Sequence, residues 1–454
     1  MLPYAGNGGY DVTNYRLDLA VDMASGFMEG VASIEAVALI DLSQFNLDLV
    51  GMDVGAVSVS TSGWEEDVST TRERRELVID NVQVIPRGTA FSVTVAYSGS
   101  PAPLPAEAGP FGPGWIGSSS QVFVFSEPDG AAGWFPSNDH PIDRAPLEIS
   151  VTVDSGWDVV SGGSLVEIAA VGDGTVRHTW RMRDAVAPYL VPLAIGRFDS
   201  RTEPDQGRSI TTWFPEGIDT ARLEPFRLQG EMIDLFEARF GPYPMESVGA
   251  LVVESDFRAA LETQTLPTYT TASLVWGEVV VAHELSHQWF GNSVTLEQWD
   301  DIWLNEGFAT MAQWLWLEHR HGIDVYDAEV AKAFSTISGL ALTESGTPAQ
   351  EAGRRAQDAF PPPDHPRKGD LFNGSVYLRG GLALVALRDL VGDDAFFTFI
   401  GDYVSEVSGR TVSTESFIDL VDVRLGGDAA GLVASWVSDR QVPDLASRGL
   451  VAPR

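Results

Sequence analysis

Residues 283–310 read HELSHQWFGNSVTLEQWDDIWLNEGFAT, and this stretch determines how the rest of the sequence is interpreted. In a helix, His283 and His287 lie on one face, one turn apart, so both imidazoles can reach a single ion. Glu306 falls within a second helix candidate, and two packed antiparallel helices can bring its carboxylate to the same ion. The chain contains no cysteine, and zinc accepts imidazole and carboxylate ligands. We therefore predict one zinc ion per chain, held by His283, His287 and Glu306, with Glu284 placed to take a proton from an attacking water.

A structural alternative for the same stretch is a buried helix whose histidines only make hydrogen bonds in the core. The apolar residues at 279–282 and at 289–290 indicate that this helix is buried. Two stacked imidazoles and a carboxylate in such a place require partners, however, and a metal ion satisfies all three. With seven histidines in the chain, a chance match to the His-Glu-x-x-His pattern has a probability on the order of 0.01. The metal site is therefore the preferred interpretation.

The pattern of apolar residues changes near residue 200. Before this point, apolar and polar residues alternate with the period of a strand in the segments 15–22, 91–97 and 147–153. After it, apolar residues recur at helical spacing in the segments 221–239, 276–290, 301–319, 375–390 and 414–425. A passage rich in proline and glycine, from 98 to 117, is predicted to be a surface loop. We predict an α+β fold of more than one domain, with a β-sheet domain at residues 1–200 and a mostly α-helical domain at residues 201–454.

The charge of the chain excludes several classes of partner. Its formal net charge is −35, and a surface this acidic repels phosphate, so neither nucleic acid nor an anionic membrane is expected as a partner. No stretch reaches the roughly 18 uninterrupted apolar residues that cross a membrane, so no membrane insertion is predicted. Compositional bias and adaptation to salt both account for the acidity, and the sequence does not separate these two explanations.

The segments HELSHQWFGNSVT at 283–295 and WLNEGFAT at 303–310 resemble the aminopeptidase N family of gluzincin metallopeptidases. The resemblance runs from about residue 10 to residue 443. Further segments that match family patterns are Glu127 within SEPDG at 126–130, APYLV at 187–191, FGPYP at 240–244, AALET at 259–263 and VYLRG at 376–380. The resemblance implies an N-terminal antiparallel, saddle-like β-sheet domain followed by a thermolysin-like, mostly α catalytic domain.

The resemblance also implies an activity and roles for further residues. The protein is expected to be a zinc metallo-aminopeptidase whose partners are peptides with a free N-terminus. Glu262 and Glu127 are expected to bind the α-amino group of the substrate, because carboxylates form charge-assisted hydrogen bonds with an ammonium. Tyr377 is expected to donate its phenol proton to the developing oxyanion. The substrate backbone is expected to pair, as an added strand, with Ala259, Ala260 and Leu261.

The sequence departs from the family pattern in several places. Ala259 replaces a glycine, Thr263 an asparagine and Arg379 a lysine. The chain also ends soon after the point where the catalytic domain of the family ends, so the helical C-terminal domain of the family is expected to be absent and the cleft more open.

Two alternative functions remain. One is a zinc endopeptidase with the same metal centre, and the other is a catalytically silent peptide-binding protein on a peptidase scaffold. Glu262 and Glu127 argue against the first, because an internal peptide bond offers no ammonium to them. The complete set of metal ligands and the presence of Glu284 argue against the second.

The cellular location is a separate expectation. No signal peptide is visible at the start of the sequence, which leaves a cytosolic protein or the mature form of an exported one. The residues Gly-Asn-Gly-Gly-Tyr at 6–10 are similar to the start of exported bacterial members of the family, which favours a secreted or cell-envelope protein. The oligomeric state and the preferred N-terminal residue are not predicted.

Overall fold

The computed structural model of the chain describes residues 2, 4–108, 112–172 and 174–453. The first part of the chain forms an eight-stranded sheet with the order β13-β14-β11-β1-β2-β8-β4-β5. Its strands are β1 (Tyr10–Asp22), β2 (Phe27–Ala38), β4 (Asp53–Thr61), β5 (Glu65–Asp67), β8 (Ala90–Gly99), β11 (Ala145–Asp154), β13 (Ser164–Gly172) and β14 (Thr175–Val186). Alternate apolar residues face the core, as do Tyr15, Leu17 and Leu19 of β1. The predicted strands at 15–22, 91–97 and 147–153 lie within β1, β8 and β11, respectively.

One pair of strands in this sheet departs from the predicted antiparallel arrangement. β1 runs antiparallel to β2 but parallel to β11, with Tyr15 opposite Leu147. The physical reason is the connection, because parallel neighbours require a long crossover rather than a tight turn. After β8 the chain leaves this sheet, forms part of another one, and returns at the end where β1 begins.

Smaller sheets pack beside the large one. One has the order β3-β7-β6 and consists of β3 (Leu42–Asp48), β6 (Ser69–Glu73) and β7 (Glu76–Ile85). Another has the order β12-β15-β10-β9 and consists of β9 (Gly114–Gly117), β10 (Val122–Phe125), β12 (Asp158–Ser161) and β15 (Leu193–Gly196). The predicted loop at 98–117 therefore ends in a strand, and its residues 109–111 lie outside the described part of the chain.

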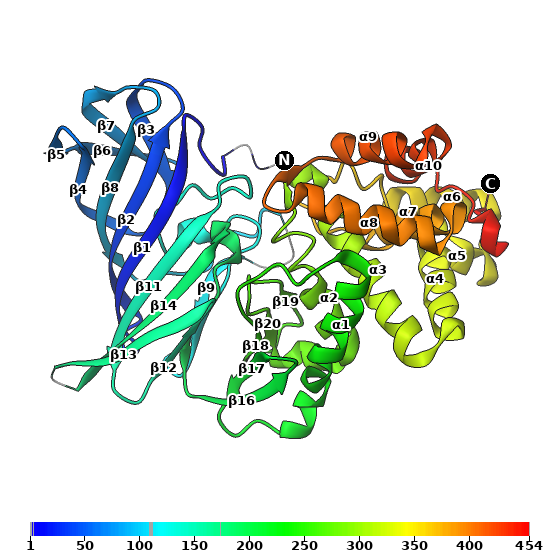
Figure 1. The fold of residues 1–454 in the computed structure, drawn as a ribbon, viewed down its shortest axis with the longest axis horizontal. Coiled ribbons are helices and arrows are strands. Elements are labelled where there is room, and N and C mark those ends of the chain that lie inside the picture. Colours follow the sequence, from blue (N-terminus) through cyan, green and yellow to red (C-terminus); the bar gives the residue numbers. More distant parts are fainter. Residues whose placement is uncertain (1, 3, 109–111, 173, 454) are drawn as a thin grey trace.

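A five-stranded mixed sheet lies between the large sheet and the helices (Figure 1). Its order is β16-β17-β18-β20-β19, and its strands are β16 (Phe198–Asp205), β17 (Arg208–Pro215), β18 (Val248–Val253), β19 (Ala260–Leu261) and β20 (Thr268–Thr270). β19 is the edge strand, because it is hydrogen-bonded to β20 on one side only. A short pair, β21 (Thr295–Leu296) and β22 (Thr411–Val412), joins two segments of the helical region.

The rest of the chain is mostly helical, and Figure 1 shows its yellow to red helices at the end of the molecule opposite the blue strands. The helices are α1 (Gln229–Phe240), α2 (Glu278–Ser286), α3 (Trp303–His321), α4 (Ile323–Ser338), α5 (Leu340–Glu344), α6 (Ala349–Ala359), α7 (Gly374–Val391), α8 (Asp393–Val407), α9 (Thr414–Leu425) and α10 (Gly427–Ser438). The prediction of an α+β fold with a β-sheet domain before a helical region is confirmed. Among the described residues, no helix is both long and apolar enough to pass through a bilayer.

Two predicted helices differ from the observed ones for local reasons. The helix predicted at 221–239 begins as a 3-10 helix, η3 (Thr220–Leu228), because Pro225 lies inside it and has no N–H to donate. The helix predicted at 276–290 is shorter. It starts only after Gly277, whose φ of 62° is not helical, and it ends in hydrogen-bonded turns beyond Ser286.

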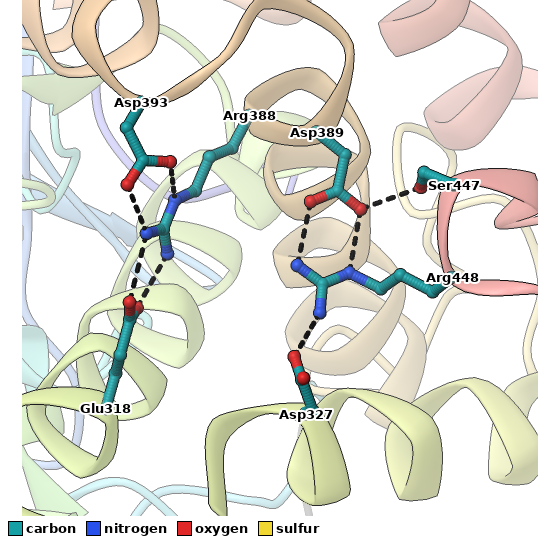
Figure 2. Close-up of polar contacts among 7 residues, drawn as sticks. All are labelled: Glu318, Asp327, Arg388, Asp389, Asp393, Ser447 and Arg448. Atoms are coloured by element: carbon teal, nitrogen blue, oxygen red, sulfur yellow. Dashed lines mark hydrogen bonds and ion pairs between the residues drawn. The ribbon is translucent and has the colours of Figure 1, made fainter. Parts of the chain in front are cut away.

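Two arginine-centred ion-pair clusters tie α7 to its neighbours (Figure 2). The Arg388 guanidinium of α7 donates to both carboxylate oxygens of Glu318 on α3, at 2.7 and 3.2 Å, and to Asp393 at the start of α8, at 2.8 Å. Arg448, in the 3-10 helix η6 (Ala446–Arg448), forms a bidentate pair with Asp389 of α7 at 2.7 Å and also contacts Asp327 of α4. Such bidentate pairs fix direction as well as distance, so α7 is held in register with α3 and α4.

Candidate metal centre and active site

The structure brings the predicted zinc ligands together at the junction of α2 and α3. His283 lies in the last turn of α2, His287 follows directly after it, and Glu306 lies in the first turn of α3. The carboxylate Oε2 of Glu306 is 3.2 Å from Nε2 of His283 and 3.6 Å from Nε2 of His287. One donor atom from each residue lies within 4.8 Å of the other two. The helical spacing of the histidines and the packing of α2 on α3 together produce a group of metal-ligand type.

The hydrogen bonds of the two imidazoles test whether this group fits zinc. Nδ1 of His283 donates to the side-chain oxygen of Gln313 at 3.1 Å, and Nδ1 of His287 donates to the carbonyl oxygen of Phe290 at 3.0 Å. Both partners are acceptors, so the proton of each neutral ring resides on Nδ1 and the lone pair of each Nε2 points toward Glu306. Two lone pairs and a carboxylate directed at one point match the two-histidine, one-glutamate ligand set of catalytic zinc.

The electrostatics of the group also favour a cation. Burial acts to raise the pKa of the Glu306 carboxyl, but the imidazoles of His287 and His283 lower that pKa to about 2. Burial acts to lower the pKa of His287, but the carboxylates of Glu262 and Glu306 raise it to about 10. The surroundings therefore stabilise positive charge at Nε2 of His287. A divalent ion bound there satisfies the same carboxylates and the same nitrogen.

A contact between glycines sets the distance between α3 and α7 next to this group. A Cβ on Gly307 would lie 2.8 Å from the carbonyl carbon of Gly380, and a Cβ on Gly380 would lie 3.0 Å from Cα of Gly307. The first contact is closer than real Cβ atoms come, and the second requires the neighbouring backbone to shift, which backbone atoms do less readily than a side chain. The close approach places Tyr377, one turn before Gly380, beside the metal group. Its ring lies 6.1 Å from that of His283 at an interplanar angle of 26°.

Arg379, which replaces a lysine of the family pattern, points away from the site. It is fully buried and donates hydrogen bonds to the carbonyl oxygens of Ser435, Trp436 and Asp439. These residues lie at the C-terminal end of α10, where carbonyl groups lack helical partners and a positive charge is favourable. This substitution therefore serves the packing of α7 on α10 and does not alter the metal group.

Three further glutamates surround the metal group. Glu284 lies on α2, Glu262 follows β19 and Glu127 follows β10, and the donor atoms of Glu127, Glu262 and Glu306 lie within 4.8 Å of one another. Glu262, Glu284 and His287 form a second group of the same size. Oε1 of Glu127 and Oε1 of Glu262 are buried and have no hydrogen-bond partner among the described residues. Burial raises the pKa of all three carboxyl groups, and for Glu127 the negative charge of Glu262 raises it further.

The position of Glu262 is fixed by residues that the sequence analysis did not single out. Its carbonyl oxygen accepts hydrogen bonds from Nε2 of Gln288 at 3.2 Å and from Nδ2 of Asn292 at 2.8 Å. Arg144, from the β-sheet region, donates to the carbonyl oxygen of Asn292 at 2.9 Å. Gln313, the partner of His283, was also missed. The available signal was its place seven residues after Glu306, on the same face of α3.

The metal group and the three glutamates around it face a cavity of about 770 Å³. Its lining includes the predicted site residues Glu127, Ala259, Ala260, Glu262, His283, Glu284, His287, Glu306 and Tyr377. Leu261 does not line the cavity and instead packs in an apolar cluster that contains Phe123 and Phe125. Ala260, in the edge strand β19, and Ala259, directly before it, border the cavity, and the other side of β19 is paired with β20.

A buried His-His-Glu group in a cavity, carried by two packed helices beside a mixed sheet, defines the class of zinc metallopeptidases. A model of the Peptidase family M1 domain matches residues 225–436. The solved M1 zinc metallopeptidase of Deinococcus radiodurans superposes with a TM-score of 0.86 at 30% identity, over 100% of this chain and 98% of that one. A mutant of the same protein bound to a Tyr-Ser-Ala substrate superposes with a TM-score of 0.85. The chain belongs to the M1 family of zinc metallopeptidases.

Longer relatives are similar over part of their length. Mouse endoplasmic reticulum aminopeptidase 1 is 27% identical over 307 residues, which are 64% of this chain and 32% of the mouse protein. Pig glutamyl aminopeptidase is 26% identical over 70% of this chain and 34% of its own length. The matched region therefore spans about a third of these relatives, whereas the Deinococcus structure is matched almost completely.

Proposed function

We propose that the protein is a zinc aminopeptidase, which hydrolyses the first peptide bond of peptides with a free N-terminus. The observation that supports this most strongly is the pair formed by Glu127 and Glu262. Each carries a buried oxygen without a partner, and both face the cavity beside the metal group. Buried carboxylates without partners are costly. A substrate ammonium supplies the hydrogen-bond donors and the opposite charge that they lack.

The edge strand supports an extended mode of substrate binding. A peptide laid along the free side of β19 adds a strand to the sheet, and its backbone hydrogen bonds do not depend on the substrate side chains. Ala259 and Ala260 present this edge to the cavity. With its amino group at Glu262, the first peptide bond of such a substrate lies next to the group formed by His283, His287 and Glu306.

The catalytic roles follow from the positions of the side chains. Zinc, when bound by the three ligands, supplies the positive charge that polarises the scissile carbonyl and acidifies water. Glu284 takes the proton of the attacking water and passes it to the leaving amine. The phenol of Tyr377 donates a hydrogen bond to the carbonyl oxygen as negative charge develops on it. Burial of these groups strengthens each of the interactions.

Both predicted domains contribute to this function. We infer that residues 1–200 supply Glu127 while residues 201–454 supply the metal ligands, Glu284, Glu262 and Tyr377. The site therefore requires the two regions to be packed together, as Arg144 and Asn292 are.

The alternative of an endopeptidase is tested by a pair of matched substrates. A free aminoacyl anilide and its N-acetylated form differ only in the ammonium group. We expect the free form to be cleaved at least about 100-fold faster in kcat/KM, the value of a charged group that contacts two carboxylates. Faster cleavage of the acetylated form would establish the endopeptidase instead.

The catalytic role of Glu284 is tested by Glu284→Gln. This variant keeps the size of the side chain and removes the base, so kcat should fall by about 10³-fold or more while one zinc ion per chain remains bound. Glu278→Gln, on the same helix but outside the cavity lining, is the matched control and should retain wild-type kcat. Substantial activity of Glu284→Gln would contradict the mechanism. A wild-type protein that binds zinc but cleaves no aminoacyl substrate would favour the silent peptide-binding protein.

A further inference from the structure

Arg258 lies at the outer end of the segment that leads along the edge strand to Glu262. Exposure decreases inward along this segment: Arg258 is exposed, Ala259 and Ala260 are half-buried, and Leu261 and Glu262 are 1% and 2% exposed. Arg258, Ala259, Ala260 and Glu262 all line the active-site cavity. The segment thus carries a positive charge at the mouth of the cavity and a negative charge in its interior.

Two cationic side chains other than histidines line the cavity, and they differ in whether a carboxylate of the protein pairs with them. Lys332, the other cationic side chain in the lining apart from the histidines, lies 3.3 Å from Glu329, which also lines the cavity from α4. Arg258 makes no hydrogen bond and no ion pair with any residue that the structure describes. An arginine without a counter-ion in a cavity lined by carboxylates is available to an anionic group of a ligand. Its planar guanidinium matches a carboxylate in two parallel hydrogen bonds.

The distance along the chain from Glu262 to Arg258 indicates the length of peptide that can contact both residues. A substrate whose ammonium is bound at Glu262 and whose backbone pairs with β19 runs outward, toward Arg258. The four residue steps from Glu262 to Arg258 span about 13 Å of extended chain, and the three residues of a tripeptide span about 10 Å. The carboxylate of an extended tripeptide therefore ends close to the backbone of Arg258, within reach of its long side chain. The carboxylate of a longer peptide lies beyond it, in solvent.

We propose that Arg258 binds the C-terminal carboxylate of short peptides and so makes tripeptides with a free carboxylate the preferred substrate class. The inference rests on the proposed aminopeptidase function and extends it. Glu262 with Glu127 recognises one end of the substrate, and Arg258 recognises the other. The spacing of these charges along the segment 258–262 sets the length of the peptide that can reach both. Salt should weaken the second contact more than the first, because Arg258 is exposed and Glu262 is buried.

The test compares a tripeptide with its C-terminal amide, which differs only in the carboxylate charge. For the wild-type protein we expect kcat/KM to be about tenfold higher for the acid, the size of one charge-assisted pair, with the difference residing mainly in KM. Arg258→Gln should reduce this ratio to near one, and Arg258→Lys should restore part of it. Lys332→Gln removes the same charge from the same cavity and should leave the ratio unchanged.

The outcomes distinguish this inference from the function on which it rests. Cleavage of an aminoacyl anilide, which has no carboxylate, reports the aminopeptidase activity alone. If the wild-type protein cleaves the anilide but treats the tripeptide and its amide alike, the inference about Arg258 is wrong and the proposed function stands. The inference is also wrong if Arg258→Gln keeps the tenfold ratio, or if Lys332→Gln loses it. If the anilide is not cleaved, the proposed aminopeptidase function is wrong, and the inference about Arg258, which rests on it, is wrong with it.

Discussion

Buried carboxylate oxygens occur both in the β-sheet region and around the cavity, and the two regions differ in the hydrogen-bond donors that surround them. In the β-sheet region, Asp48 is fully buried, and its Oδ2 accepts hydrogen bonds from the backbone N–H groups of Gly6 and Asp139 at 3.1 and 3.0 Å. Asp143 accepts a hydrogen bond from the N–H of Val12 at 3.0 Å on one oxygen and a second bond on the other. Around the cavity, Oε1 of Glu127 and Oε1 of Glu262 are buried and have no partner among the described residues. Oδ1 of Asp48 has none either, but the two glutamates line the cavity and Asp48 does not.

The comparison shows what burial alone does not reveal. Burial raises the pKa of Asp48 to about 7, and it raises the pKa of Glu127 as well. A raised pKa is therefore common to a structural carboxylate and to a candidate binding group. The surroundings separate them: backbone N–H groups donate to one oxygen of Asp48, away from the cavity, whereas the oxygens of Glu127 and Glu262 without partners belong to residues that line the cavity, where a ligand can supply the donors. Substitutions in the two regions should consequently affect different measurements.

The largest effect that distinguishes the regions is expected for Glu262→Gln. Removing the charge weakens the contact with the substrate ammonium, so kcat/KM for a free aminoacyl substrate should fall about 100-fold. The preference over the acetylated substrate should fall with it. The free energy of unfolding should stay the same or rise, because a repulsive buried charge is lost. Glu254→Gln, at an exposed position just before the same segment, should change neither quantity. A loss of stability without a loss of selectivity would make Glu262 a structural residue like Asp48.

The opposite result is expected for Asp48→Ala. The backbone N–H groups of Gly6 and Asp139 lose their acceptor, which should lower the free energy of unfolding by about 2–4 kcal/mol. The metal group and the cavity lining do not include Asp48, so kcat/KM should remain within about twofold of the wild-type value. Urea unfolding and a standard activity assay measure both. Asp199→Ala, at an exposed position, serves as the control, and a large loss of activity for Asp48→Ala would remove the distinction between the regions.

The smallest effect concerns pH. Burial raises the pKa values of Asp48 and Asp143 to about 7, so the folded protein binds protons more tightly there than the unfolded chain does. The resulting stabilisation is complete below the unfolded pKa of about 4 and is lost as the pH rises through about 7. The melting temperature should therefore fall between about pH 5 and pH 8. Asp48→Asn, which is uncharged at every pH, should show a shallower fall, and identical profiles for the variant and the wild type would contradict this account.

The sequence predicts the metal group better than its surroundings, and the reason is distance along the chain. The helical period alone places His283 and His287 on one face, and a second helix brings Glu306 within reach. Glu127 and Glu262, by contrast, were identified only through the family resemblance, because no local pattern predicts that distant segments meet at one cavity. The parallel pairing of β1 and β11 was missed for the same reason.

Residues that act through hydrogen bonds to the backbone were the hardest to predict. Gln288 and Asn292 hold the carbonyl oxygen of Glu262, and the sequence gives a glutamine or an asparagine no period that indicates such a partner. Local patterns succeed where one element determines the answer, as for the helix predicted at 414–425, which is observed as α9 with the same bounds. Local patterns do not predict contacts that depend on how separate elements pack against one another.

The contact of Gly307 with Gly380 has a consequence for how the enzyme tolerates change. Because main chain meets main chain there, the gap between the carboxylate of Glu306 and the phenol of Tyr377 does not depend on the rotamers of intervening side chains. Substitutions elsewhere in the core can loosen the protein while leaving these two groups aligned. A single methyl group at position 307 would force the helices apart and misalign them even if the protein remained folded. The fidelity of the catalytic geometry thus depends on the absence of two side chains.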